Sequence, residues 1–281
     1  MTTIKRFLDT TKSLLTNPKA FGLLKILYAL LLATLLGFAW VREATISQVA
    51  ITFVFLVLIP IEFFVLQAAI LHHARTQKFH WAQIGRDAIK LAVVSIPIVL
   101  LGFLVAYLLN KWQAHYLAPE PLLAAPGART PPATQPLHWP TVLFATVRLL
   151  ILGVALPLAT IHLWIEVTAR DLRASLDGGA KTVSKRVGNA LAGAFAFDSV
   201  LTYGLGLIVF VLVPYAILFV RIPAKGTKTD FAVFIAQLLL AYSFTLIGWT
   251  VTLTTLARST RETSPAVPVS TVPNAPAEAP A

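Results

Sequence analysis

Residues 49–71 read VAITFVFLVLIPIEFFVLQAAIL, and this stretch is the most informative about the class of fold. It contains a single ionisable side chain, that of Glu62. At about 1.5 Å per residue, a helix of this length covers the hydrocarbon core of a bilayer, which is roughly 30 Å thick. A backbone in lipid must satisfy its own hydrogen bonds, and a continuous apolar run does so as a helix rather than as a barrel strand. We therefore interpret residues 49–71 as a transmembrane helix.

Comparable runs occur along most of the chain, of which 57% is hydrophobic and only 12% charged. The charged share of an ordinary soluble domain is about twice as large. The predicted spans cover residues 21–41, 49–71, 91–109, 141–167, 199–220 and 231–256. We expect an all-α integral membrane protein with six transmembrane helices in three hairpins, and short amphipathic interfacial helices beside them.

The remaining segments are polar or rich in proline. Residues 1–20 form a polar N-terminal segment before the membrane domain of residues 21–257. The loop at residues 111–140 holds seven prolines and cannot be regular helix. Residues 258–281 are rich in Pro, Ala, Ser and Thr, and we expect a disordered tail.

The net charge of +11 comes from basic residues next to the apolar runs, which argues against a nucleic-acid partner. Sixteen Lys and Arg residues flank one side of the predicted spans and six flank the other. The positive-inside rule therefore predicts that both termini are cytoplasmic. Short loops suggest a bacterial inner membrane, with anionic lipid at the basic cytoplasmic segments. The basic loop before the sixth span is an exception to the pattern, and it leaves the orientation of the last two spans open.

Three segments mix basic and apolar residues at helical spacing just before the first, third and fifth spans. They are residues 10–21, 76–90 and 171–197. We expect each to form a short amphipathic helix on the inner leaflet. Together with Ala-Arg pairs that end the second, fourth and sixth spans, they are compatible with a three-fold repeat. Arg is common at any cytoplasmic span end, so the repeat stays an open question.

The fourth predicted span carries three ionisable side chains. At about 100° per residue, Glu166 falls at the same helical angle as Arg148, eighteen residues earlier, and His162 lies within about 40° of that line. A face of this kind suits a proton relay, a substrate site or helix packing. The ordinary alternatives are a boundary ion pair between Glu166 and Arg170 and a structural hydrogen bond of His162. A kink at Pro157 could also shift the phase.

Glu62 is the other charge within a span, two residues after Pro60. A proline frees a backbone carbonyl in the preceding turn, and broken helices with nearby carboxylates often form ion or substrate sites. Arg148 is its expected partner, and a water molecule or a neutral, protonated form of Glu62 would serve as well. The candidate binding residues are thus Glu62, Arg148, His162 and Glu166.

No motif in the sequence indicates a particular reaction. The chain has no cysteine, and we identify no metal site, no cofactor and no catalytic group. We expect transport or handling of a small molecule or lipid through a polar helix-bundle interior. The alternative is a non-catalytic accessory or assembly subunit of a membrane complex; an enzyme ranks third. A protein partner or homo-oligomer is compatible with either interpretation.

Overall fold

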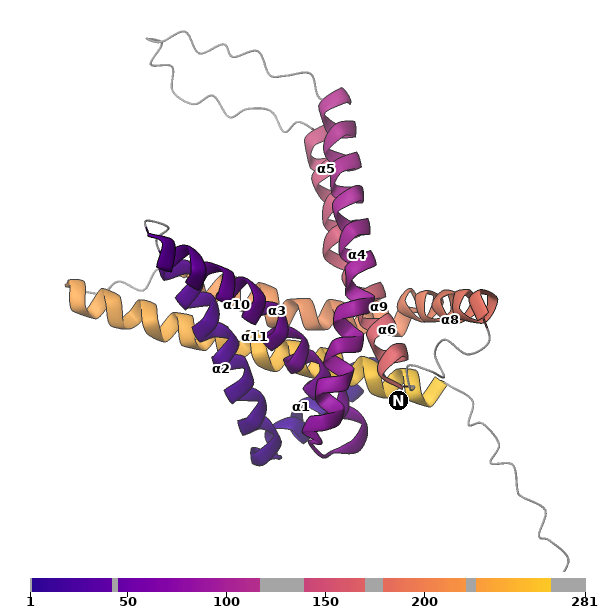
Figure 1. The fold of residues 1–281 in the computed structure, drawn as a ribbon, viewed down its shortest axis with the longest axis horizontal. Helices are drawn as coiled ribbons and strands as arrows, with labels where there is room; N and C mark the ends of the chain where they lie inside the picture. The colour runs from indigo at the N-terminus through magenta and orange to yellow at the C-terminus, as the bar shows by residue number, and fades with distance from the viewer. Residues whose placement is uncertain (1, 42–44, 117–138, 170–178, 221–225, 264–281) are drawn as a thin grey trace, which may run out of the picture.

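The computed structural model describes residues 2–41, 45–116, 139–169, 179–220 and 226–263, and these residues form helices joined by short turns (Figure 1). Within these ranges, six helical stretches are long and apolar enough to cross a membrane. They are Pro18–Trp40, Ile46–Thr76, Trp81–Tyr116, Trp139–Ala169, Phe197–Phe219 and Thr227–Thr260. The predicted all-α class with six candidate spans is therefore confirmed.

The first three candidate spans are single α-helices, preceded by α1 (Thr3–Leu15). They are α2 (Pro18–Trp40), α3 (Ile46–Thr76) and α4 (Trp81–Tyr116). At the start of α2, the Asn17 side chain accepts a hydrogen bond from the Ala20 amide at 3.2 Å, and Pro18 occupies the first turn. At the end of α3, Gln77 adopts a left-handed conformation with φ 58°, which turns the chain toward α4.

The fourth and fifth spans are composite. The fourth consists of α5 (Trp139–Arg148), the π-helical stretch η1 (Leu149–Ala155) and α6 (Leu156–Ala169). The fifth consists of α9 (Phe197–Leu207), the π-helical stretch η2 (Ile208–Leu212) and α10 (Val213–Phe219). A single helix, α11 (Thr227–Thr263), forms the sixth span, and α8 (Gly179–Ala194) lies before the fifth.

The spans pair as three hairpins, whose free ends diverge in Figure 1. The tip of the α4–α5 hairpin points upward in that view, whereas the α10–α11 tip points to the left. The buried core lies at the opposite ends of the hairpins, where α3, α4, α6 and α11 meet. Its completely buried leucines include Leu66, Leu71, Leu91, Leu158, Leu253 and Leu256. Lipid tails are as apolar as leucine, so this packing is stabilised mainly by close contact and interhelical hydrogen bonds.

The predicted amphipathic segments differ from one another in the structure. The first segment, residues 10–21, includes the end of α1. This helix packs on α2, α9 and α11. At the start of α1, the Thr3 hydroxyl donates a hydrogen bond to the Asp198 carboxylate of α9 at 2.6 Å. The segment at 171–197 contains α8, with residues 170–178 outside the described part.

The segment at 76–90 is not a helix of its own, because from Trp81 onward it is the first part of α4. Ile84, Ala88 and Leu91 are buried at spacings of four and three, so one packed face continues into the span. The prediction of a separate short helix at this position is therefore wrong, although residues 81–90 are helical.

Two helices extend further than the sequence indicates. Helix α4 includes residues 111–116, which fall in the predicted proline-rich loop; this stretch precedes Pro119, the first proline of the loop. Helix α11 runs to Thr263, past the predicted tail boundary at residue 257, and ends two residues before Pro265. The remaining loop at 117–138 and tail at 264–281 lie outside the described residues.

Candidate functional site

Pro157 changes the backbone of the fourth span. Proline has no amide hydrogen, so the Gly153 carbonyl, four residues earlier, loses its α-helical donor. The turn before the proline is π-helical, and the Leu156 amide donates to the Ile151 carbonyl instead. The Tyr203 hydroxyl of α9 donates to the Gly153 carbonyl oxygen at 3.2 Å. A side chain of the third hairpin thus donates to the carbonyl that, because of this proline, lacks the usual amide donor four residues later.

Pro214 has the same effect in the fifth span. The Val213 amide donates to the Ile208 carbonyl across the π-helical stretch η2. The carbonyl without an α-helical donor is that of Phe210, again four residues before the proline. It accepts a hydrogen bond from the Thr245 hydroxyl of α11 at 3.3 Å, and the same hydroxyl lies 3.0 Å from the Ala241 carbonyl. Both π-helical stretches are therefore tied to a neighbouring helix by a hydroxyl group.

A cavity of about 250 Å³ lies between the first and third hairpins, beside η2. Its lining comes from α2, α3, η2 and α11, and is formed by Tyr28, Leu31, Phe63, Leu66, Gln67, Phe210, Thr245 and Trp249. Four of these side chains are aromatic and two are leucines, with an amide and a hydroxyl as the other groups. An apolar cavity with a few polar groups, placed between helices, is a common form of ligand site.

The polar groups of this cavity link its two walls. The Trp249 indole nitrogen donates to Gln67 Oε1 at 2.7 Å, and Gln67 is only 1% exposed. The Tyr242 hydroxyl of α11 also donates to the Tyr28 carbonyl of α2, and the two tyrosine rings lie 4.6 Å apart. The first and third hairpins are therefore joined by side-chain hydrogen bonds beside the cavity.

Glu62 lies next to the cavity, on α3. Its Oε1 accepts a hydrogen bond from the Thr34 hydroxyl of α2 at 3.0 Å. Its Oε2 is buried and has no hydrogen-bond partner among the described residues. Leu66, four residues after Glu62, and Leu31, three residues before Thr34, both line the cavity. Because side chains three or four residues apart share a helix face, the Glu62–Thr34 pair lies about one turn from the cavity wall.

Arg148, the expected partner of Glu62, does not contact it. Arg148 is the last residue of α5, and its side chain is exposed at the protein surface. The Thr34 hydroxyl takes its place as the partner of the carboxylate. The predicted pairing of Glu62 with Arg148 is therefore wrong.

His162 and Glu166 lie apart from Glu62, on α6. His162 is 4% exposed, and its Nε2 is buried without a hydrogen-bond partner in the described part of the chain. It packs against α8, where a Cβ on Gly193 would lie 3.5 Å from His162 Nδ1. Glu166 is partly buried one turn further along.

Arg148 and His162 lie in different surroundings: no residue of α5 is buried and Arg148 is exposed, whereas His162 is buried on α6. The π-helical stretch Leu149–Ala155 lies between them, and its i to i+5 bonding changes the turn per residue. A constant angle of about 100° per residue therefore does not hold along the whole span. What Arg148, His162 and Glu166 do for function stays a prediction.

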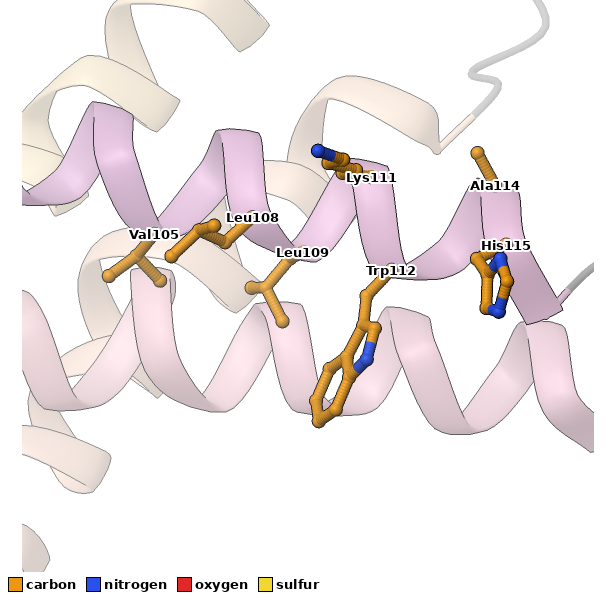
Figure 2. A pocket seen from close by; sticks show the side chains of 7 residues that line it. All are labelled: Val105, Leu108, Leu109, Lys111, Trp112, Ala114 and His115. Atoms are coloured by element: carbon orange, nitrogen blue, oxygen red, sulfur yellow. The ribbon is translucent and has the colours of Figure 1, made fainter.

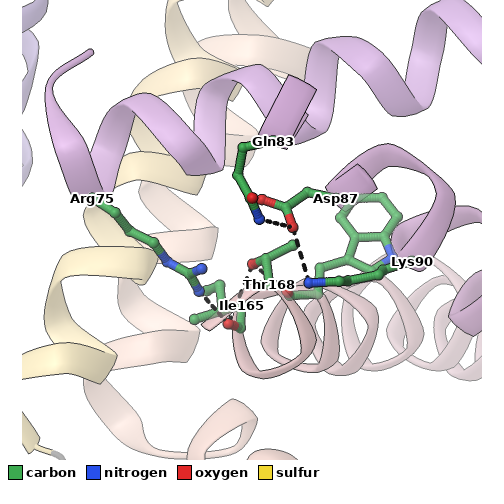
Figure 3. A network of polar contacts seen from close by, with 7 residues as sticks. Arg75, Gln83, Asp87, Lys90, Ile165 and Thr168 are labelled. Carbon is green, nitrogen blue, oxygen red and sulfur yellow. Dashed lines mark hydrogen bonds and ion pairs between the residues drawn. The ribbon is translucent and has the colours of Figure 1, made fainter. Parts of the chain in front are cut away.

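A buried polar network that was not predicted from the sequence lies where α3, α4 and α6 meet (Figure 3). Asp87 and Lys90 form an ion pair at 3.2 Å and are 3% and 6% exposed. Gln83 donates to the same carboxylate oxygen at 3.1 Å, while Arg75 of α3 donates to the Ile165 carbonyl of α6. The i, i+3 and i, i+4 spacings of residues 83, 87 and 90 are a visible signal for such a cluster. Of these contacts, the Arg75–Ile165 bond joins the first hairpin to the second, whereas the bonds among residues 83, 87 and 90 lie within α4.

Trp164 adds a further cross-link at the packed ends. Its indole nitrogen donates to Ser95 Oγ of α4 at 2.9 Å, and that hydroxyl donates to the Leu91 carbonyl at 2.7 Å. The position of Trp164 near a predicted span end indicates only an interfacial aromatic residue. Its indole N–H instead finds the buried partner that tryptophan usually requires.

A larger hollow of about 760 Å³ lies at the far end of α4 (Figure 2). Its lining runs along this one helix, from Val105 to His115, and includes Lys111 and Trp112. Among the described residues, no second helix contributes to this lining. The hollow therefore lacks the converging groups that define the cavity between the first and third hairpins.

Within the described residues, no group of three or more His, Asp or Glu side chains converges in a way that could hold a metal ion. No family model, curated protein or solved structure matches this chain.

Proposed function

We propose that this multi-pass membrane protein binds and carries a hydrophobic small molecule or lipid in the cavity between α2, α3, η2 and α11. The observation that carries this proposal is the cavity itself, which is partly open and is lined by helices of different hairpins. Four aromatic rings offer a large apolar contact area to a ligand. The Gln67 amide offers polar atoms beyond the one that Trp249 already binds.

Carrying requires that the cavity changes shape, and η2 is the part of its wall suited to this. Phe210 lies within η2, and its carbonyl accepts a hydrogen bond from the Thr245 hydroxyl, while Pro214 cannot supply the usual amide four residues later. A side-chain hydrogen bond can be exchanged without unwinding a helix, and π-helical turns frequently occur at functional sites. We propose that η2 and α11 move against α2 and α3 when the ligand enters or leaves.

We also propose the finer placement in the cell that the charge pattern supports: a bacterial inner membrane with both termini in the cytoplasm. Helix α1 fits this orientation. Its Phe7 and Leu14 are buried against the bundle, whereas Ile4 and Leu8 on another face are 53% and 61% exposed. Exposed lysines at positions 5 and 12 lie beside these two side chains, as expected of a helix that rests on anionic lipid headgroups.

Two neighbouring leucines of α2 provide a matched test of the ligand site. Leu31 lines the cavity, whereas Leu30 is 52% exposed on the outside of the helix. The protein is extracted from its own membrane in a mild detergent, and molecules that stay bound are identified by native mass spectrometry. Leu31→Trp should fill the cavity and remove a bound hydrophobic molecule, while Leu30→Trp should retain it.

The same spectra separate the carrier from the accessory alternative. Equal retention by Leu30→Trp and Leu31→Trp would show that the molecule binds elsewhere and would reject the proposed site. A stoichiometric protein that copurifies in place of a small molecule would instead favour an accessory or assembly role.

A further inference from the structure

The Glu62 carboxylate has an unused acceptor close to the cavity. Thr34 satisfies Oε1 at 3.0 Å, while Oε2 is buried and has no donor among the residues that the structure describes. Leaving a buried acceptor without a donor is costly, and a charged one in the hydrocarbon region more so. Side chains of this kind usually lie where a donor or a cation visits.

The position of Glu62 relative to the cavity is set by the two antiparallel helices α2 and α3. Leu31 and Leu66 both line the cavity, and Thr34 and Glu62 lie one helical turn beyond them, about 5 Å along the helices. Gln67 lies in the opposite direction along α3, one residue after Leu66. A ligand in the cavity therefore has an amide at one end and a carboxylate near the other.

The lining itself favours a positively charged ligand. Tyr28, Phe63, Phe210 and Trp249 surround the cavity, and the faces of aromatic rings attract cations. None of the lining residues that the structure describes carries a charge. A neutral ligand would leave the Glu62 carboxylate uncompensated, whereas an ammonium group supplies both a donor and the opposite charge.

We propose that the ligand of this cavity is a hydrophobic ammonium compound, whose apolar body lies among the aromatic rings and whose N–H donates to Glu62 Oε2. This assignment rests on the proposed carrier function and names the class of molecule carried. Thr34 acts as a positioning residue, because its hydroxyl holds the other carboxylate oxygen and so orients Oε2.

The test compares two probes that differ only in the head group. n-Octylamine is protonated at neutral pH, whereas n-octanol is neutral and has the same alkyl chain. Saturable binding of each labelled probe to the purified full chain is measured by equilibrium dialysis in neutral maltoside micelles. We expect octylamine to bind at least about tenfold more tightly, as a charge-assisted hydrogen bond would give.

Variants then assign the preference to one side chain. Glu62→Gln keeps the shape and the acceptor for Thr34 but removes the charge, so the preference for octylamine should be lost while octanol binding is unchanged. Asp9→Asn removes an exposed carboxylate on α1 and should leave both affinities as they are. Leu31→Trp should abolish saturable binding of both probes.

The outcomes separate the two proposals. If both probes bind equally to the unmodified chain and Leu31→Trp abolishes both, the cavity binds ligands but the cation assignment is wrong. If Leu31→Trp leaves binding intact, the proposed carrier site itself is wrong. The comparison of the two probes on the unmodified chain decides the cation assignment even where Glu62→Gln fails to fold.

Discussion

The Tyr203 hydroxyl lies 3.2 Å from the carbonyl oxygen of Gly153 and donates a hydrogen bond to it. Gly153 is the residue four positions before Pro157, so its carbonyl is the one that the proline deprives of its α-helical donor. The bond connects the third hairpin to the second, close to the point where the fourth span changes from π-helix to α-helix. It therefore links a local backbone interruption to the packing of two separate hairpins.

Tyr203→Phe should destabilise the folded state by about 1 kcal/mol, because it removes the hydroxyl that donates to the Gly153 carbonyl. Unfolding by SDS titration from mixed micelles measures the change. Tyr215→Phe is the matched control, since Tyr215 is 59% exposed and its loss should change little.

A double-mutant cycle with Pro157→Ala tests the reason for that effect. Alanine at position 157 restores the amide that can donate to the Gly153 carbonyl. In that background, Tyr203→Phe should hardly change the free energy of unfolding. If Tyr203→Phe lowers the free energy of unfolding equally with proline and with alanine at position 157, the Tyr203 hydroxyl acts in another way.

The same cycle with Thr245→Val and Pro214→Ala should give a smaller coupling. The Thr245 hydroxyl is 3.3 Å from the Phe210 carbonyl and is shared with the Ala241 carbonyl at 3.0 Å. Its removal therefore takes away a longer bond, for which we expect about 0.5 kcal/mol. A coupling larger than that of Tyr203 and Pro157, measured by the same unfolding titration, would contradict this ranking.

Alanine substitution should have different effects on stability at two glycines of α9. A Cβ on Gly206 would overlap the Thr252 hydroxyl of α11 and lie 2.9 Å from Thr252 Cγ2, whereas nothing lies within 4 Å of a Cβ on Gly204. We expect Gly206→Ala to destabilise by about 1–3 kcal/mol through overpacking. Gly204→Ala should be neutral or slightly stabilising, because alanine favours helix. Thermal unfolding of both variants in the same detergent tests this prediction. Similar melting temperatures for the two variants would contradict the close approach of α9 and α11.

The Gln67–Trp249 bond should show strong coupling between its partners. Gln67→Leu leaves the indole N–H without its acceptor, and Trp249→Phe leaves the glutamine oxygen without its donor; each should cost about 1–3 kcal/mol. The double variant should cost less than the sum of the two, as SDS titration would measure. Trp112→Phe, at a residue 60% exposed, serves as the control.

Removal of Lys90 should be among the most destabilising single changes. Lys90→Met leaves the buried Asp87 carboxylate without its cation, which typically costs about 3–5 kcal/mol. Adding Asp87→Asn should recover part of that loss, because asparagine is neutral and still accepts from Gln83. Lys78→Met, at an exposed lysine, is the control. Equal stability of Lys90→Met and Lys78→Met would show that the ion pair contributes nothing.

The positions of the helices could largely be predicted from hydropathy, and the errors have local causes. Residues 111–116 and the start of the tail continue α4 and α11, because a charged or polar residue outside the lipid does not end a helix. Residues 81–90 merge with the third span because their buried face is continuous with that of Leu91. Hydropathy indicates where the apolar span ends, but the helix continues beyond that point.

The candidate site was harder to predict. Glu62 is beside the cavity, but its partner is Thr34 and not Arg148. The neighbouring Gln67 and Trp249 were not recognised, since a glutamine and a tryptophan 182 residues apart carry no pattern in the sequence. The relation between Arg148 and His162 depended on whether the turn before Pro157 is α-helical or π-helical.

Local rules applied to the sequence were enough to establish that this chain is helical and how many stretches can cross a membrane. A helix in lipid satisfies its backbone within one segment, and apolar length sets the span. The tertiary structure was needed to establish which hydroxyl reaches the carbonyl four residues before each of Pro157 and Pro214, which helices line the cavity and which acid lies beside it. These relations join residues far apart in the chain, and they depend on packing between helices whose outer surfaces are equally apolar.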